Sequence, residues 1–308
     1  MNRAAPFGLA KIFALAKRAR LQIFLAALIA LYFAAAPKTE KAVTSALLNP
    51  KYEPDQIELF EPGRGRLLLT KAGGFWLGQA PLDCASSNCG ADSGAGNDAF
   101  GASDQALDGE NSLYFICDNT VVQKLLYNLK RIVKLYEISY KKSSENNFGL
   151  RQDRAFLIKI RQKSEVISSL KFGSVDSLGR IFLSADKNTK IWSTDSAPLA
   201  PYLTASADFW AAPEIFPKSV VGADKKWRHG KLARVALDWS PASVKTFDPG
   251  DGNLYRALFL PKADGDYLCR FEAVPAAHRP QEEKDALKKL NAVFDVSAWT
   301  YSRVFDGE

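Results

Sequence analysis

The feature of the sequence that most constrains the fold is an uncharged run close to the N-terminus. Residues 21–36 read LQIFLAALIALYFAAA and contain no charged side chain. A helix of this length extends roughly 24 Å, slightly less than the ~30 Å hydrocarbon core of a bilayer. The residues before it include five cations and no acid. Because positive charge stays on the cytoplasmic side, the pattern predicts a single membrane pass with the N-terminus inside.

Two other interpretations of this run carry less weight. Ala34 and Ala36 resemble the small residues of a signal-peptide cleavage site, but Pro37 would follow the cut, which disfavours cleavage. A buried core helix is disfavoured behind five cations. We therefore predict a protein of the bacterial cytoplasmic membrane. Residues 1–20 would lie in the cytoplasm, 21–36 would form the transmembrane anchor and 37–54 a tether, and the remainder would be periplasmic or extracytoplasmic.

The positive net charge is concentrated at the N-terminus. The chain has a formal charge of +7, and removing the five N-terminal cations leaves +2 for residues 37–308. A nearly neutral body with mixed charges lacks the basic face that nucleic acid requires. The predicted partners therefore include a lipid bilayer and exclude nucleic acid.

Four cysteines follow the apolar run: Cys84, Cys89, Cys117 and Cys269. An even count in an exported domain is typical of disulfides, and four cysteines allow three pairings. The favoured pairing joins Cys84 to Cys89 and Cys117 to Cys269. A zinc site is disfavoured because the Cys-x4-Cys spacing has no further Cys or His at ligand distance. Free buried thiols are the remaining alternative.

Short apolar runs separated by Gly and Pro predict strands over most of the chain. Residues 56–61, 66–71 and 75–77 form a β-meander pattern. Residues 84–111 are rich in Gly, Ser, Ala, Asn and Asp and predict a long loop. An apolar stripe predicts a helix over 121–133, and residues 136–140 follow as a strand. Further strands are expected between 155 and 193, over 232–240 and over 253–274, with a helix over 281–290.

A short internal similarity suggests duplication. Phe60–Leu67 matches Phe247–Leu254 at five of eight positions, and residues 136–139 resemble 294–297. The alternative is that turn-rich strands resemble one another by chance. We predict an α+β fold, in which an N-terminal transmembrane helix precedes duplicated antiparallel β-meander plus helix units. The units would be 55–150, with the insertion 84–111, and 232–308, with a β-rich unit at 151–231 between them.

The sequence contains no recognisable catalytic pattern. It has two histidines, His229 and His278, and no nucleophile elbow, phosphate loop, dinucleotide fingerprint or His-Glu-x-x-His motif. Both histidines are interpreted as exposed, and an enzyme centred on either is the least favoured hypothesis. Acidic pairs near Asp248 and Asp264 are interpreted as hairpin turns rather than calcium ligands. No catalytic, cofactor-binding or metal-binding residue is predicted.

Aromatic residues give the only candidates for ligand contact. Most of the six Trp fall in strand patterns, where core packing is their usual role. Trp210 and Trp227 lie in the less regular stretch 205–230, and Arg228 follows in a basic run. These three residues are predicted to contact a ligand or a partner. The alternative function that they support is binding of envelope glycan or peptidoglycan.

Several segments resemble one known family. They are the meander that ends Gly74-Phe75-Trp76-Leu77, the predicted helix followed by Phe148-Gly149-Leu150, and the stretch that contains Asp208-Phe209-Trp210. Together they resemble family 4340 of domains of unknown function over most of residues 55–217. The resemblance implies an auxiliary envelope protein that accompanies a gliding-type ABC transporter, with its permease or a related auxiliary subunit as partner. It implies no cofactor and no catalytic residue. The insertion 84–111 departs from the family pattern.

Overall fold

The computed structural model describes residues 42–62, 65–81, 112–139, 142–185, 190–218, 227–233, 240–248 and 254–306, together with Phe24 and Ala26. Residues 42–308 form one compact unit. The strands are β1 (Ala42–Ala46), β2 (Gln56–Glu61), β3 (Gly65–Ala72), β4 (Phe75–Pro81), β5 (Ser112–Ile116), β6 (Ile132–Ser139), β7 (Phe156–Gln162), β8 (Glu165–Val175), β9 (Arg180–Ala185), β10 (Ile191–Asp195), β11 (Leu232–Ala233), β12 (Ser243–Phe247), β13 (Leu254–Pro261), β14 (Tyr267–Val274) and β15 (Val293–Val296). The helices are α2 (Asn119–Lys130), α3 (Ala200–Leu203), α4 (Ala207–Trp210), α6 (Gln281–Lys288) and α7 (Ala298–Asp306), with a 3-10 helix η1 (Lys142–Phe148).

The first ten strands form one antiparallel sheet in the order β1-β6-β10-β9-β8-β7-β2-β3-β4-β5. Strands β2, β3, β4 and β5 are neighbours in both sequence and space, as a meander requires. The sheet is completed by long-range pairing, because β2 pairs with β7 on its other side. Strand β6 lies near the opposite edge, between β1 and β10.

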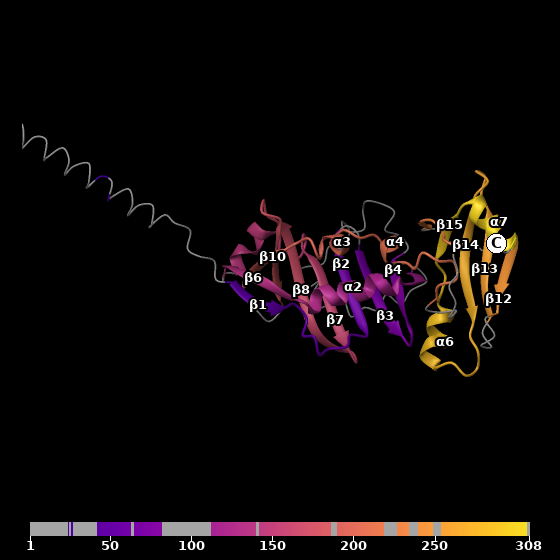
Figure 1. Ribbon diagram of the computed structural model, residues 1–308, viewed down its shortest axis with the longest axis horizontal. Coiled ribbons are helices and arrows are strands. Elements are labelled where there is room, and N and C mark those ends of the chain that lie inside the picture. Colours follow the sequence, from indigo (N-terminus) through magenta and orange to yellow (C-terminus); the bar gives the residue numbers. More distant parts are fainter. Residues whose placement is uncertain are drawn as a thin grey trace, which may run out of the picture. The chain divides into compact units, whose positions relative to one another are not determined.

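Helix α2 covers one face of this sheet (Figure 1). Its side chains Val122, Leu125 and Leu129 are buried, and they pack with Ile57 and other inward residues of the sheet. The spacing of these residues places them on one side of a helix. Asp118 begins the helix by accepting a hydrogen bond from the backbone N–H of Thr120 at 2.8 Å. This face is the main core of the protein, and we call it the core face.

The remaining strands form a five-stranded antiparallel sheet in the order β11-β15-β14-β13-β12. Helices α6 and α7 pack on it through buried Ala286, Leu287 and Val304. The same hydrophobic cluster includes Phe75 and Ile116 of the larger sheet. The second core therefore belongs to both sheets, and it holds them together as one unit.

The outer edge of β5 is closed by residues from the smaller sheet. The backbone N–H groups of Asn291 and Ala292 donate to the carbonyl oxygen of Tyr114 at 3.2 and 3.1 Å. The Asn291 side chain accepts from the N–H of Tyr114 at 2.7 Å and donates to the carbonyl oxygen of Ser112 at 2.8 Å. One asparagine thus makes hydrogen bonds that a neighbouring strand would otherwise make.

Helix α6 also contacts the larger sheet, at the turn between β3 and β4. Glu283 accepts a hydrogen bond from the backbone N–H of Gly74 at 3.3 Å. Its other carboxylate oxygen accepts from Arg279 at 2.8 Å, and Arg279 also donates to the Tyr255 hydroxyl at 2.6 Å. Glu283 is therefore fixed from two sides against the turn that Gly73 forms.

The predicted fold class is wrong. The structure consists mainly of antiparallel strands, and its helices are short. The two matching stretches each connect a pair of neighbouring antiparallel strands, β2 to β3 and β12 to β13. The strands after the two helices differ, because β6 pairs with β1 and β10, neither of which belongs to the meander before it, whereas β15 pairs with β11 and with β14 of the preceding meander. The similarity reflects the turn chemistry that hairpins share and does not mark duplicated meander plus helix units.

The predicted membrane-anchored localisation is contradicted. Among the residues that the structure describes, no helix is both long and apolar enough to span a bilayer. The longest described helix, α2, has 12 residues and extends about 18 Å, against the ~30 Å that a bilayer core requires. The predicted anchor, residues 21–36, lies outside the described part of the chain apart from Phe24 and Ala26.

The predicted disulfide between Cys117 and Cys269 is also wrong. Both thiols are free and buried. Cys117 belongs to the core beneath α2, whereas Cys269 belongs to the second core, so the fold places them in different clusters. Burial raises the pKa of both thiols, which keeps them protonated and unreactive. Cys84 and Cys89 lie outside the described residues.

Replacement of Gly73 tests the contact between α6 and the larger sheet. Gly73 has φ +58°, and a Cβ there would overlap the Glu283 side chain. Gly179 has φ +76°, and a Cβ at that position would have no neighbouring atom within 4 Å. Gly179→Ala is therefore a matched control. Both Gly→Ala changes add backbone strain of about 1–2 kcal/mol. Gly73→Ala should cost about 1–3 kcal/mol more because it displaces Glu283 from its hydrogen bonds.

Urea denaturation of both variants measures this difference in the free energy of unfolding. Equal losses in Gly73→Ala and Gly179→Ala would show that the Glu283 contact contributes nothing to stability.

Candidate functional site

An open groove lies on the core face, beside the ends of β2, β3 and β4. About 320 Å³ of it is open to the centre of a water molecule, which is at the lower end of the range of ligand-pocket volumes. Its floor is formed by one residue from each of the strands β2, β3, β4 and β7, namely Leu59, Leu67, Ala80 and Phe156. Glu61 adds a carboxylate to the lining, whereas the guanidinium of Arg66, which also borders the groove, pairs with Glu58 at 3.0 Å. The groove therefore combines an apolar floor with one carboxylate at its border.

The facing wall is the connection that contains α3 and α4. Residues of this wall are Tyr202, Thr204, Ala205, Ser206, Ala207 and Trp210. Four-residue helices are too short to be stable alone, so packing must hold them. The rings of Tyr202, Phe209 and Trp210 supply it, with centroids 5.5 to 5.8 Å apart. The wall is an aromatic cluster rather than a regular element.

Beyond the wall, the chain joins the two sheets through a series of antiparallel backbone hydrogen bonds. The N–H of Ala212 donates to the carbonyl oxygen of Ile116 on β5 at 2.8 Å. Residues 213–215 pair with 227–229, where the N–H of His229 donates to the carbonyl oxygen of Pro213 at 3.1 Å. Residues 230–233 then pair with β15. We call residues 211–217 and 227–233 the junction.

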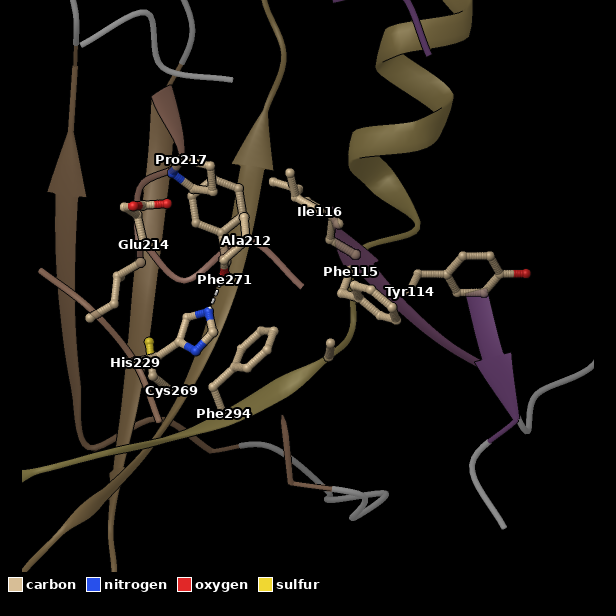
Figure 2. A pocket seen from close by; sticks show the side chains of 13 residues that line it. Tyr114, Phe115, Ile116, Ala212, Glu214, Pro217, His229, Cys269, Phe271 and Phe294 are labelled. Carbon is tan, nitrogen blue, oxygen red and sulfur yellow. Dashed lines mark hydrogen bonds between the residues drawn. The ribbon is translucent and has the colours of Figure 1, made fainter. Parts of the chain in front are cut away.

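His229 occupies the centre of the junction (Figure 2). Its ring stacks on Phe294 of β15 with centroids 3.8 Å apart and 24° between the planes. Nε2 lies 2.6 Å from the carbonyl oxygen of Ala212, and Nδ1 lies 2.8 Å from that of Gly230. The imidazole thus contacts three segments of chain, which explains why the sequence interpretation of His229 as an exposed residue is wrong.

Burial dominates the electrostatics of this histidine. Loss of hydration lowers the pKa of His229 below its usual 6.5. The two carbonyl contacts and the nearby carboxylate of Asp208 oppose this shift and do not cancel it. Above that lowered pKa, the ring is neutral and donates from one nitrogen only.

The cavity beside His229 is small. It is lined mainly by apolar residues such as Ile116, Phe271 and Phe294, with Glu214 and Cys269 also present. About 20 Å³ is open to the centre of a water molecule, which is room for about one water. The groove, rather than this cavity, is therefore the candidate binding site, and the cavity belongs to the junction.

The structure separates the residues that the sequence predicted as a contact site. Trp210 is fully buried in the main core, so its indole face is not open to a ligand. Trp227 is half-buried and packs against Phe216 of the second core at 5.9 Å between centroids. Arg228 is exposed on the junction and forms a backbone bridge with Glu214. The three residues do not form one surface.

Sequence reasoning missed the residues that build the groove and the junction. Asp208 accepts a hydrogen bond from the N–H of Leu232, which ties α4 to β11. The motif Asp208-Phe209-Trp210 marks this position in the sequence, although it contributed only to the family resemblance. The sequence could not identify Leu59 and Leu67 as groove residues, because residues of the groove floor alternate along a strand in the same way as core residues.

The structure offers no preformed metal centre in its described part. Among the residues in the ranges given above, no group of three His, Cys, Asp or Glu side chains lies close enough to hold an ion. Comparison with family models, with curated proteins and with solved structures found no match to this chain. The resemblance to family 4340 therefore stays a prediction.

The lowered pKa of His229 predicts how stability depends on pH. The unfolded histidine titrates near 6.5 and the folded one at a lower pH, so between these values the unfolded chain binds more protons. The contribution of His229 is thus complete above about pH 6.5 and is lost as the pH falls toward the folded pKa. His229→Gln should remove this part of the acid sensitivity.

Urea unfolding at about pH 7.5 and about pH 5.5 measures the effect. His278→Gln is the control, since His278 is the only other histidine and is exposed. It should retain the difference between the two pH values, and an unchanged difference in His229→Gln would refute the assignment.

Proposed function

We propose that the protein is a non-catalytic accessory or scaffold protein that binds a segment of a partner protein in the groove. The observation that carries this proposal is the groove itself. Its floor continues the main core, because Leu59 and Ala80 are core residues while Leu67 and Phe156 are partly buried beside them. Apolar floors of this kind provide affinity, and the Glu61 carboxylate adds a polar group that can orient a ligand.

The neighbouring helices indicate the kind of ligand that fits. Helices α2, α3 and α4 all pack on the core face. The groove is the part of this face where Leu67 and Phe156 stay partly accessible. A chain segment with apolar side chains on one side and charged residues beside them would extend the same layer. The partner implied by the family resemblance, a subunit of an ABC-type transport complex, is one source of such a segment.

A photo-crosslinking experiment tests the proposal. The photoreactive residue p-benzoylphenylalanine replaces Thr204, which lines the groove, or Leu178, a 74% exposed residue that does not line it. Irradiation in cells should give one defined protein adduct from position 204 and none from 178. A second change, Ala205→Trp, fills the groove and should abolish the adduct.

The outcomes distinguish binding in the groove from nonspecific crosslinking. Mass spectrometry should map the crosslinks from position 204 to one continuous segment of one partner. Equal labelling from positions 204 and 178, or an adduct that persists when Ala205→Trp fills the groove, would exclude the groove as the binding site.

A second candidate function is binding of envelope glycan, and Trp299 favours it. Trp299 on α7 is 69% exposed, and the Arg303 guanidinium lies 5.0 Å from its ring centroid. An exposed aromatic face beside a cation can stack on a sugar ring and donate hydrogen bonds to its hydroxyls. This residue replaces Trp210 and Trp227 as the aromatic contact for the glycan hypothesis.

Retention on insoluble peptidoglycan tests this second function. Trp299→Ala should lower the retained fraction roughly tenfold, as the loss of about 1.4 kcal/mol would. Tyr127→Ala is the matched control, because Tyr127 is also 69% exposed and lies on α2. If both variants are retained as well as the unchanged protein, glycan binding through Trp299 is refuted.

A further inference from the structure

The segment Ser206–Ala212 contacts the groove on one side and the junction on the other. Ser206, Ala207 and Trp210 line the groove. Within the same seven residues, Asp208 accepts the N–H of Leu232, and the carbonyl oxygen of Ala212 contacts His229. Because α4 has only four residues, its position depends on these attachments. A change at His229 therefore acts on one of the contacts that hold the wall of the groove, beside the backbone bonds of Ala212 to Ile116 and of Trp210 to Asp118.

The geometry around His229 depends on how many protons its ring carries. Both ring nitrogens face backbone carbonyl oxygens, which only accept hydrogen bonds. A neutral imidazole has one N–H, so it satisfies one carbonyl and directs a lone pair at the other. A protonated imidazole has two N–H groups and donates to both. The Gly230 contact sets the ring orientation, and the Ala212 contact attaches the ring to the groove wall.

The surroundings of the ring contain both charged and neutral groups. The nearest acid is Asp208 on α4, which favours the protonated ring. On β15, Asp295 directs its carboxylate to Lys262 at 3.2 Å. The other titratable groups that line the cavity with the ring are Glu214 of the junction, Cys269 of β14 and Tyr114 of β5, and Arg228 and Lys231 are its neighbours in the sequence. The Cys269 thiol is protonated and carries no charge, and Asp208 is the charged group that acts on the pKa of His229.

We propose that His229 is a proton-operated latch that sets the position of the groove wall. In acid, the doubly protonated ring donates to both carbonyl oxygens and fixes Ala212 against the junction. Above the titration, the neutral ring makes one of these two bonds, and the wall from Ser206 to Ala212 is held less firmly. The proposal deepens the proposed function and rests on it only for the role of the groove, since it adds pH regulation to that same site.

Heteronuclear NMR of the full chain in the absence of any partner tests the latch. His278→Gln leaves His229 as the only histidine, so its imidazole Hε1 signal reports the protonation of that ring alone. The Trp210 indole N–H and the Ala212 amide report the groove wall. Both should shift with pH along a single-proton curve that has the same midpoint as the imidazole signal. The exposed indole of Trp299 is the internal control and should not follow this curve.

The second variant and the outcomes complete the test. In His229→Gln, the shared curve should vanish from the Trp210 and Ala212 signals, because glutamine does not titrate. Wall signals that stay constant while the imidazole titrates would overturn the latch, even if His229→Gln failed to fold. Wall signals that titrate identically in His229→Gln would overturn it as well. Because no partner is present, the result is independent of the crosslinking at position 204.

Discussion

The closure of the β5 edge is the constraint on which the arrangement of the protein depends. A strand edge enclosed by protein loses water, so its N–H and C=O groups need partners from the chain itself. Here the partners come from Asn291, Ala292 and Ala212, which belong to segments far from β5 in sequence. Satisfying this edge joins the two sheets, builds the second core between them and places the junction next to the groove.

The position of the groove wall follows from this closure. Ala212 pairs with Ile116 at the end of β5, and the N–H of Asp118 donates to the carbonyl oxygen of Trp210 at 2.8 Å. The wall is therefore an aromatic cluster attached to a closed strand edge, with no long helix or strand of its own. Its buried rings hold it to the main core, and the hydrogen bonds at its ends set where it meets the junction.

Particular residues show what the sequence could and could not predict. The stripe Val122, Leu125 and Leu129 predicted α2, because helical spacing is a local property. The pairing of β2 with β7, and the place of β6 beside β1, could not be predicted, since long-range pairing leaves no local pattern. The even number of cysteines led to a wrong disulfide prediction, because the sequence does not show which residues come together in space. Cys117 and Cys269 are free, buried side chains in different cores. Trp210 was predicted as a contact residue, but residue type does not reveal whether an indole faces the core or the solvent, and this one is buried in the core.

The identity of residue 229 follows from the demands of the junction. The residue must stack on Phe294, which requires a flat ring, and it must bond to carbonyl oxygens at both ends of that ring. Phenylalanine satisfies only the first demand, tyrosine has one polar atom, and glutamine lacks the ring. Histidine meets both, but only when doubly protonated, and burial disfavours that state. The packing that makes histidine the best fit at this position thus also makes its hydrogen bonds depend on protonation, which is why the proposed latch lies where the two sheets are joined.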